Sequence, residues 1–595
     1  MTADTIPSRL FRQQRIRPKD PAYFAKKNGQ WVETTWGEYG DQVKRAGKAL
    51  IALGLEKNAS VCILGFNRPE WVIMDVANMC VGGAPAGIYA TCSPPEVQYI
   101  VHHCEAKVVL VENEAQWQKI HKERANLPHL RHVVMMQGAP KIDDPLVMSW
   151  EEFLARAEGI PDERFFDRIE QLEPKGLATL IYTSGTTGPP KGVMLSHENL
   201  SWTAACAQQI TEISSRDVAL SYLPLSHIAE QMFTIHGPIT GGMSVYFAES
   251  IEKVPDNLKE VRPTVFFAVP RIWEKFHAGI SGKMALADDK KKKLLAWARG
   301  VGTAATAHKA SGKPLPFALA AQYKLASKLV FSKLKAAIGL DRARVCVSGA
   351  APVAREVLEF FGSLDIMVSE VYGQSEDTGP TSFNRNGKLR YGTVGPAIPG
   401  VDVRIAKDDE IIVRGPNVFL GYYKEPQATA ETLIDGWLHS GDLGRFDDDG
   451  FLQITGRKKE IIITAGGKNI APKNIEASLK NHPLVNEAVV IGDRRKYLTA
   501  LVTLDPEAVA AFCKDRGLDA TRAHELAEIR AEVQRAVDAA NEELARVEQI
   551  KKFAILARNF GVDTGELTPT LKVKRKKVNE IWGAEIEAMY PEGEG

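Results

Sequence analysis

The sequence predicts an α/β protein with a large N-terminal domain and a smaller C-terminal domain. Two observations predict this class: buried-strand runs alternate with helical patterns up to about residue 390, and short alternating strands replace them beyond it. A strand–helix–strand succession favours a mainly parallel sheet. The 595 residues also exceed one ordinary domain, since about 150 residues per domain is typical.

The expected N-terminal elements follow one another regularly. Residues 37–53 carry apolar side chains at helical spacing, residues 60–65 form a buried-strand run, and residues 69–79 predict the next helix. The same rhythm then predicts further strands at 107–111, 177–182, 218–223, 264–269 and 344–349.

Beyond residue 390, glycine, proline and aspartate become frequent. Runs such as VDVRIA and DEIIVRG alternate apolar and polar residues, which predicts small antiparallel strands in a compact barrel or sheet. We place this β-rich subdomain at 391–456, so that the N-terminal domain spans 1–456 and the C-terminal domain 457–595. The C-terminal domain returns to an α/β mix, which we expect to end in a charged helix at 520–548 and a polar tail.

Composition excludes several classes of protein. Lysine plus arginine number 75 and aspartate plus glutamate 74, so the formal net charge is +1. This balance argues against a nucleic-acid-coating protein, which needs a large positive field. The seven cysteines contain no CxxC pair, which suits a reducing compartment. No secretory signal or membrane-spanning run is visible, and we expect a cytoplasmic protein.

Positive charge is concentrated in residues 283–337. The segment contains twelve lysines and arginines against Asp288 and Asp289, a local balance of +10. One interpretation is a solvated helix face whose lysine stems cover the core. The other is a peripheral contact with an anionic membrane, such as the inner face of a membrane. Nucleic acid is not an expected partner, and the sequence does not determine the oligomeric state.

The strongest chemical signal is the segment YTSGTTGPPKG at 182–192. Its glycines let the backbone approach an anion closely, its hydroxyls can donate to phosphate oxygens, and Lys191 adds a positive charge. It is not a Walker A loop, because Pro190 and Gly192 flank the lysine. We expect the segment to leave a strand, bind phosphate and enter a helix.

This segment resembles the phosphate loop of the adenylate-forming (AMP-binding) superfamily of acyl-CoA synthetases, luciferases and peptide-synthetase adenylation domains. Further segments resemble the same family in the same order: LPLSH at 223–227, GAAP at 349–352, YGQSE at 372–376, GWLHSGD at 436–442, GRKKE at 456–460 and TPTLK at 568–572. The TPTLK segment resembles the corresponding motif of long-chain and bubblegum-type acyl-CoA synthetases. The resemblance implies an N-terminal domain of two packed αβ subdomains plus a small β-barrel-like subdomain, followed by a mobile α+β domain.

The resemblance also implies a site for ATP. The residues that it assigns to the nucleotide are Thr183, Ser184, Gly185, Thr186, Thr187, Gly188, Lys191, Gly349, Ala350, Ala351, Tyr372, Gly373, Gln374, Ser375, Asp442 and Arg457. Thr183 and Glu376 would hold Mg²⁺, a cation that prefers oxygen ligands. Asp442 would accept both ribose hydroxyls, and Arg457 would contact the ribose or the phosphates.

Four residues are implied in the chemistry itself: Lys572, Thr183, Glu376 and His227. Lys572 would reach the substrate carboxylate and the α-phosphate, with Lys574 as the alternative among the neighbouring lysines. His227 would line the acyl site. The residue after it, Ile228, cannot bind a substrate ammonium as the aspartate of peptide synthetases does, so a simple carboxylic acid is expected.

A hinge is implied at Lys459, about which the C-terminal domain would rotate between two half-reactions. Rotation would withdraw Lys572 from the site. It would also bring up a glycine-containing loop, where Gly466 and Gly467 would border a narrow tunnel for the pantetheine of CoA.

These implications together predict an AMP-forming long-chain fatty acid–CoA ligase of lipid metabolism. It would use ATP, Mg²⁺ and CoA to convert a fatty acid first to an acyl-adenylate and then to a thioester. One alternative is a fatty acyl-AMP ligase that delivers to a carrier protein. Another is a catalytically silent scaffold that binds lipid or nucleotide.

Overall fold

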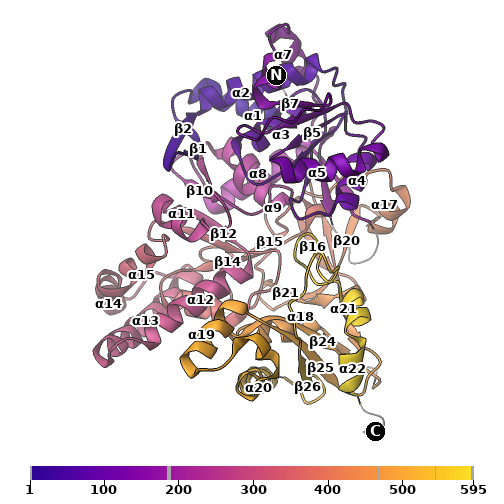
Figure 1. Cartoon of the computed structure of the whole chain (residues 1–595). Helices are drawn as coiled ribbons and strands as arrows, with labels where there is room; N and C mark the ends of the chain where they lie inside the picture. Colours follow the sequence, from indigo (N-terminus) through magenta and orange to yellow (C-terminus); the bar gives the residue numbers. More distant parts are fainter. Residues whose placement is uncertain (1–2, 184–188, 467, 543, 591–595) are drawn as a thin grey trace.

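The computed structural model describes residues 3–183, 189–466, 468–542 and 544–590 (Figure 1). Over these ranges, three larger sheets build the N-terminal portion, and two smaller ones lie in the C-terminal portion. The predicted fold class is therefore confirmed. The C-terminal hydrophobic clusters contain residues from Ile462 onward, so this portion has cores of its own. The domain boundary at residue 456 stays a prediction.

The first eight-stranded sheet carries the glycine-rich segment. Its order is β7, β6, β5, β3, β4, β8, β9 and β18, and the strands from β7 to β8 are parallel. The runs VCIL of β3 and VVLV of β5 are buried throughout, as in a sheet covered on both faces. The strands span Val61–Leu64 (β3), Ala86–Ile88 (β4), Val108–Val111 (β5), His132–Met135 (β6), Val147–Ser149 (β7), Leu177–Thr183 (β8), Lys191–Ser196 (β9) and Gly421–Tyr422 (β18).

Helices cover this sheet. The α2 helix begins after Thr35, whose hydroxyl accepts from the amide of Glu38 while the Glu38 carboxylate accepts from the amide of Thr35. The α3 helix is buried along nearly its whole length, as its apolar sequence predicts. The helices of this region are α1 (Ile6–Ile16), α2 (Trp36–Ala52), α3 (Pro69–Cys80), α4 (Pro94–His103), α5 (Glu114–Glu123), α6 (Trp150–Ala155) and α7 (Asp162–Glu170).

The second eight-stranded sheet has the order β2, β1, β11, β10, β12, β13, β14 and β15. Its strands span Pro21–Lys27 (β1), Gln30–Thr35 (β2), Val218–Ser221 (β10), Ser244–Phe247 (β11), Val265–Ala268 (β12), Val345–Ser348 (β13), Val368–Tyr372 (β14) and Ser382–Phe383 (β15). The neighbouring helices are α8 (His197–Thr211), α9 (Ile228–Gln231), α10 (Gly237–Gly241), α11 (Val254–Val261), α12 (Pro270–Ala285) and α16 (Arg355–Ser363). A π-helical turn at Met232–His236 joins α9 to α10.

The basic segment forms a helical projection at one end of the molecule (left in Figure 1). It contains α13 (Asp289–Ala310), α14 (Phe317–Ala326), a π-helical turn (Ser327–Phe331) and α15 (Ser332–Ala337). Ala298, Val301, Val330 and Phe331 form a small core between these helices.

The β-rich region forms a five-stranded antiparallel sheet, as predicted. Its strands are β16 (Asp402–Ile405), β17 (Glu410–Arg414), β19 (Leu433–Ile434), β20 (Trp437–Phe446) and β21 (Leu452–Arg457), and α17 (Pro426–Thr432) packs beside β18 and β19.

Residues 550–588 contain a strand and two helices where a polar tail was predicted, so that prediction was wrong. The charged segment divides at Leu526 into a 3-10 turn and α20, and a strand and two helices follow. The strand forms because its apolar residues Ile550 and Phe553 pack into the C-terminal core. The elements are β22 (Ile462–Ile463), β23 (Asn469–Ile470), α18 (Pro472–Leu479), β24 (Val485–Ile491), β25 (Leu498–Leu504), α19 (Pro506–Arg516), α20 (Ala527–Glu542), β26 (Ile550–Ile555), α21 (Arg575–Ile581) and α22 (Gly583–Ala588).

Candidate functional site

The glycine-rich segment connects two antiparallel strands. Thr183 at the end of β8 pairs with Lys191 at the start of β9, and Tyr182 pairs with Gly192. The expected entry into a helix was wrong: the run KGVMLS forms the strand β9, paired with β8, and α8 begins only after Ser196. The predicted phosphate-binding residues 184–188 lie outside the described residues. Lys191 is nevertheless fixed by the β8–β9 pairing.

Glu376 lies in a 3-10 turn (Ser375–Asp377) that follows β14. The Tyr422 hydroxyl donates to Glu376 Oε1 over 2.8 Å, and Lys191 Nζ lies 4.8 Å from the centroid of the Tyr422 ring. The structure therefore brings Lys191 and Glu376 to one tyrosine. Sequence reasoning missed Tyr422, because its role depends on a pairing of β18 with β9 that local patterns do not reveal.

The predicted ribose-binding carboxylate, Asp442, is held from two sides. Tyr372 donates from its hydroxyl to Asp442 Oδ2 over 2.9 Å, and Arg457 Nε lies 3.3 Å from Oδ1. Burial raises the pKa of Asp442, while Arg457, Tyr372 and Lys572 act in the opposite direction. Tyr372 and Arg457 thus fix the orientation of the Asp442 carboxylate, one at each oxygen.

The predicted adenine-binding segments follow adjacent strands. Gly349 follows β13 and Gly373 follows β14, and a side chain on Gly373 would collide with the carbonyl of Gly379. Two buried polar atoms here, Ser348 Oγ and Gln374 Nε2, have no hydrogen-bond partner in the described part of the chain. Such atoms are expected where a ligand completes the bonding.

The two alanines and the serine predicted beside them differ in exposure. Ala350 has a φ of +67°, a strained backbone conformation for a residue other than glycine. Ala350 and Ala351 are exposed, whereas Ser375 is buried.

Lys572 lies on a tight loop of the C-terminal portion. The amide of Thr568 donates to the carbonyl of Lys572, the amide of Lys572 donates to Thr568 Oγ1, and Leu571 between them has a φ of +60°. Lys572 is exposed to solvent.

The electrostatic surroundings of Lys572 come from both portions of the chain. Desolvation, followed by the charges of Arg457 and Lys473, lowers the pKa of Lys572, and Asp442 and Glu376 oppose this. The structure therefore brings Lys572 to the two carboxylates predicted for the ribose and the metal. Lys574 instead directly precedes α21, and its amide donates to the carbonyl of Glu566.

His227 caps the short helix α9. Its Nδ1 accepts from the amide of Ala229 over 3.1 Å. Burial, followed by the charge of Lys572, lowers the pKa of His227 to about 4, so the ring is neutral at physiological pH. His227 thus lies close enough to Lys572 to respond to its charge.

Contacts between the two portions hold the Lys572 loop in place. Thr91 Oγ1 donates to the carbonyl of Pro569 over 2.7 Å. Farther away, Arg271 of α12 donates to Asp505 Oδ2 over 2.9 Å and to Asn486 Oδ1 over 3.1 Å. Sequence reasoning missed Thr91 and Arg271, since their partners lie in the other portion of the chain.

The predicted hinge and tunnel residues lie on the surface. Lys459 is exposed in a 3-10 turn (Lys458–Glu460) directly after β21, and Gly466 is exposed in the turn between β22 and β23. Gly467 lies outside the described residues.

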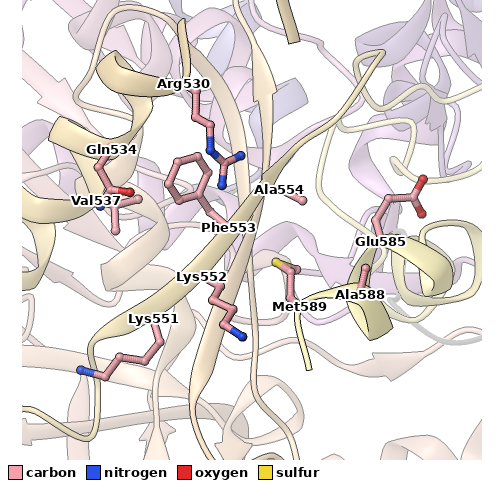
Figure 2. Close-up of a pocket in the computed structure, with 10 residues that line it drawn as sticks. All are labelled: Arg530, Gln534, Val537, Lys551, Lys552, Phe553, Ala554, Glu585, Ala588 and Met589. Carbon is pink, nitrogen blue, oxygen red and sulfur yellow. The ribbon is translucent and has the colours of Figure 1, made fainter. Parts of the chain in front are cut away.

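A surface hollow of about 420 Å³ lies in the C-terminal portion, between α20, β26 and α22. Figure 2 shows Arg530, whose guanidinium lies 4.6 Å from the centroid of the Phe553 ring, together with Lys551, Lys552 and Glu585. None of the predicted site residues lines this hollow.

The donor set around Glu376 fits Mg²⁺. No cluster of three or more histidine, cysteine or acidic side chains suited to a metal occurs among residues that the structure describes. Mg²⁺ is commonly held by one or two carboxylates together with substrate phosphates and water. The single carboxylate of Glu376, whose partner Tyr422 also contacts Lys191, is therefore compatible with such a site.

Comparisons with known proteins identify the family of this chain. Residues 10–423 match the AMP-binding enzyme family, and residues 459–594 match the AMP-binding enzyme C-terminal domain. The protein is an adenylate-forming enzyme by fold and belongs to the AMP-binding enzyme family.

Individual relatives and solved structures are also similar to this chain. The long-chain-fatty-acid–CoA ligase ACSBG2 of Xenopus laevis is 39% identical, with 98% of this chain and 83% of the relative covered. The ACSBG2 of Homo sapiens is 37% identical, with 99% and 93% covered. Among solved structures, the anthranilate CoA ligase AuaEII complexed with anthranoyl-AMP has a TM-score of 0.74 at 20% identity, covering 98% of each chain. ATP-bound MatB from Rhodopseudomonas palustris has a TM-score of 0.69 at 22% identity, covering 98% of this chain and 99% of its own.

Among the helices that the structure describes, none is both long enough and apolar enough to cross a bilayer.

Proposed function

We propose that this protein is an AMP-forming ligase that joins a long-chain fatty acid to CoA through an acyl-adenylate. One observation carries the proposal: Lys572, from the C-terminal portion, lies within electrostatic reach of Asp442, Glu376 and His227 of the N-terminal portion. The full-length similarity to long-chain-fatty-acid–CoA ligases supports the substrate class.

In the first half-reaction, a carboxylate oxygen of the fatty acid bonds to the α-phosphorus of ATP. The bond from that phosphorus to the bridging oxygen breaks, and pyrophosphate leaves with the electron pair. Both partners are anions, so cations must offset their repulsion. We assign this task to Lys572 at the carboxylate and α-phosphate, and to Lys191 at the departing phosphates.

The remaining nucleotide contacts follow from the positions of the side chains. Asp442 would accept the ribose hydroxyls, with Arg457 beside it, and the partly exposed face of Tyr372 would stack on adenine. Glu376 and Thr183 would hold Mg²⁺, which when bound neutralises phosphate charge. The unpaired Gln374 Nε2 is a donor suited to the base.

In the second half-reaction, the CoA thiol attacks the acyl carbonyl carbon as its thiolate, and AMP leaves. We propose that the C-terminal portion first rotates about Lys459, which withdraws Lys572. The segment 464–467 would then border the pantetheine path. The cytoplasmic location stays a prediction.

Two assays test the function. Fatty-acid-dependent release of pyrophosphate from ATP, measured across short to very long chains, should peak with long-chain acids. Absence of such release would support the silent scaffold. CoA-dependent release of AMP should follow, whereas AMP release that requires an acyl carrier protein would support the acyl-AMP ligase.

The helical projection supports a second proposal, a contact with an anionic membrane through 283–337. The projection exposes large apolar side chains among its lysines: Phe317 is 92% exposed, Leu286 89% and Leu325 51%. A solvated helix face would not need these apolar groups, whereas a membrane-surface helix inserts them below the lipid headgroups. A membrane at this surface would also be a source of the apolar substrate.

Vesicle binding separates the two components of this contact. Neutralising 290–293 should weaken binding to vesicles that contain phosphatidylglycerol but not to pure phosphatidylcholine vesicles. Replacing Phe317 and Leu286 by serine should weaken binding to both. Unchanged binding of both variants would leave the projection as a solvated face.

A further inference from the structure

Tyr422 occupies a fixed position between strand β9 and the Glu376 turn. Its strand β18 pairs antiparallel with β9, where Tyr422 is opposite Val193, and the amide of Tyr423 donates to the carbonyl of Gly192 over 2.8 Å. The same segment holds the Glu376 turn, because the amide of Phe419 donates to the carbonyl of Glu376 over 2.9 Å. The backbone around Tyr422 thus connects both elements.

The Tyr422 side chain uses two different parts of its ring. The hydroxyl at its edge donates to Glu376 Oε1 over 2.8 Å, and its ring lies 4.8 Å from Lys191 Nζ. Tyr422 is 9% exposed and packs edge-on against Phe419, with ring centroids 5.0 Å apart.

We propose that Tyr422 is a positioning residue that holds Glu376 and Lys191 in the arrangement that Mg²⁺ and the ATP phosphates require. This rests on the proposed roles of Glu376 and Lys191. The phenol occupies one carboxylate oxygen of Glu376 and leaves the other for the cation. The ring attracts the Lys191 ammonium through its quadrupole. The Tyr422 side chain therefore positions the Glu376 carboxylate for the metal and the Lys191 ammonium for the phosphates.

Two substitutions separate these contacts. Tyr422→Phe keeps the ring near Lys191 and removes the hydrogen bond to Glu376, whereas Tyr422→Leu removes both. Binding of Mn²⁺ to the enzyme with a non-hydrolysable ATP analogue, followed by electron paramagnetic resonance, reports the metal contact directly. Binding of the analogue without metal reports the Lys191 contact.

Tyr422→Phe should weaken Mn²⁺ binding about tenfold, the usual size for one hydrogen bond to a charged group, and leave metal-free nucleotide binding unchanged. Tyr422→Leu should weaken both. Tyr423→Phe is a matched control: its ring packs near His103 and Lys424, and both affinities should stay at the wild-type values. Unchanged or tighter Mn²⁺ binding by Tyr422→Phe would overturn the proposal, even if Tyr422→Leu fails to fold.

Glu376→Gln distinguishes this inference from the proposed function. If Glu376→Gln leaves Mn²⁺ binding unchanged, the metal role of Glu376 is wrong and the inference falls with it. If Glu376→Gln weakens Mn²⁺ binding and Tyr422→Phe does not, only the role of Tyr422 is wrong. In the double variant, the loss should equal that of Glu376→Gln alone, because the phenol acts through the carboxylate.

Discussion

The candidate nucleotide site and the helical projection use charged residues in opposite ways. In the site, Asp442 lies between Tyr372 and Arg457, and Glu376 is bonded to Tyr422. In the projection, lysines 290–293 are exposed to solvent. Charges that are partly withdrawn from water interact strongly over short distances, whereas exposed charges are screened. Function in the site should therefore depend on single residues, and function in the projection on the sum of many.

Lys572→Ala should have the largest effect, and it tests whether function in the nucleotide site depends on single residues. We expect acyl-adenylate formation to fall about 100- to 1,000-fold, because a cation is lost where two anions must meet. Thioester formation from supplied acyl-adenylate should be spared, since Lys572 would be withdrawn for that step. Fatty-acid-dependent pyrophosphate release and CoA-dependent AMP release measure the two steps separately. Equal loss of both would assign a different role to Lys572.

Asp442→Ala should have the second-largest effect. Loss of the acceptor for both ribose hydroxyls should weaken ATP binding about 10- to 100-fold, the range expected for hydrogen bonds to a charged group. Direct titration with ATP measures this. Asp402→Ala is a control, because that exposed carboxylate pairs with Arg414 away from the predicted site residues. An unchanged ATP affinity would contradict the ribose assignment.

Glu230 lies in α9, the helix that His227 caps, and burial favours its neutral, protonated form. Its Oε1 accepts from Ser221 Oγ and Thr234 Oγ1, each over 2.8 Å, and burial raises the pKa of Glu230 to about 8. The unfolded chain loses this proton near pH 4.5, while the folded protein keeps it up to about pH 8. The free energy of unfolding should therefore decrease with rising pH in this window, by up to about 1.4 kcal/mol per pH unit.

Glu230→Gln removes this dependence, because glutamine has a similar shape and does not titrate. We expect the stability advantage of the wild type over the variant to decline from pH 5 to pH 8. Urea-unfolding midpoints at several pH values measure the difference. A constant difference across the window would show that Glu230 is ionised in the folded protein.

The sequence predicted the buried strands better than the contacts between elements that are distant in sequence. The runs of β3, β5, β12 and β13 are apolar enough to identify them as strands. The hairpin from Thr183 to Lys191 was misassigned, since its second strand was expected to be a helix.

The family resemblance, and not local patterns, assigned Asp442, Glu376 and Lys572. A single carboxylate after a turn, or one lysine among several, indicates no specific role by itself. Tyr422 and Arg271 were missed because their partners, Glu376 and Asp505, are distant in sequence. Such long-range pairings depend on the tertiary fold, which no local spacing encodes.

The smallest expected effect is that of one lysine in the projection. Lys291 pairs with Asp288 over 2.9 Å, and both side chains are largely exposed. Neutralising one exposed lysine should reduce binding to phosphatidylglycerol vesicles by about 1 kcal/mol, or roughly fivefold. Lys291→Gln should reduce it least, since the charge of Lys291 is partly offset by Asp288.

Vesicle sedimentation of the single variants and of the quadruple variant at 290–293 tests whether the effects add. Additive losses would confirm that the projection acts through its summed charge, in contrast to the nucleotide site. Lys407→Gln, at an exposed lysine of the β-rich region, is the matched control and should bind like the wild type. If one of the four lysines accounted for the whole loss, the projection would instead contain a specific headgroup site, and the contrast between the two regions would be wrong.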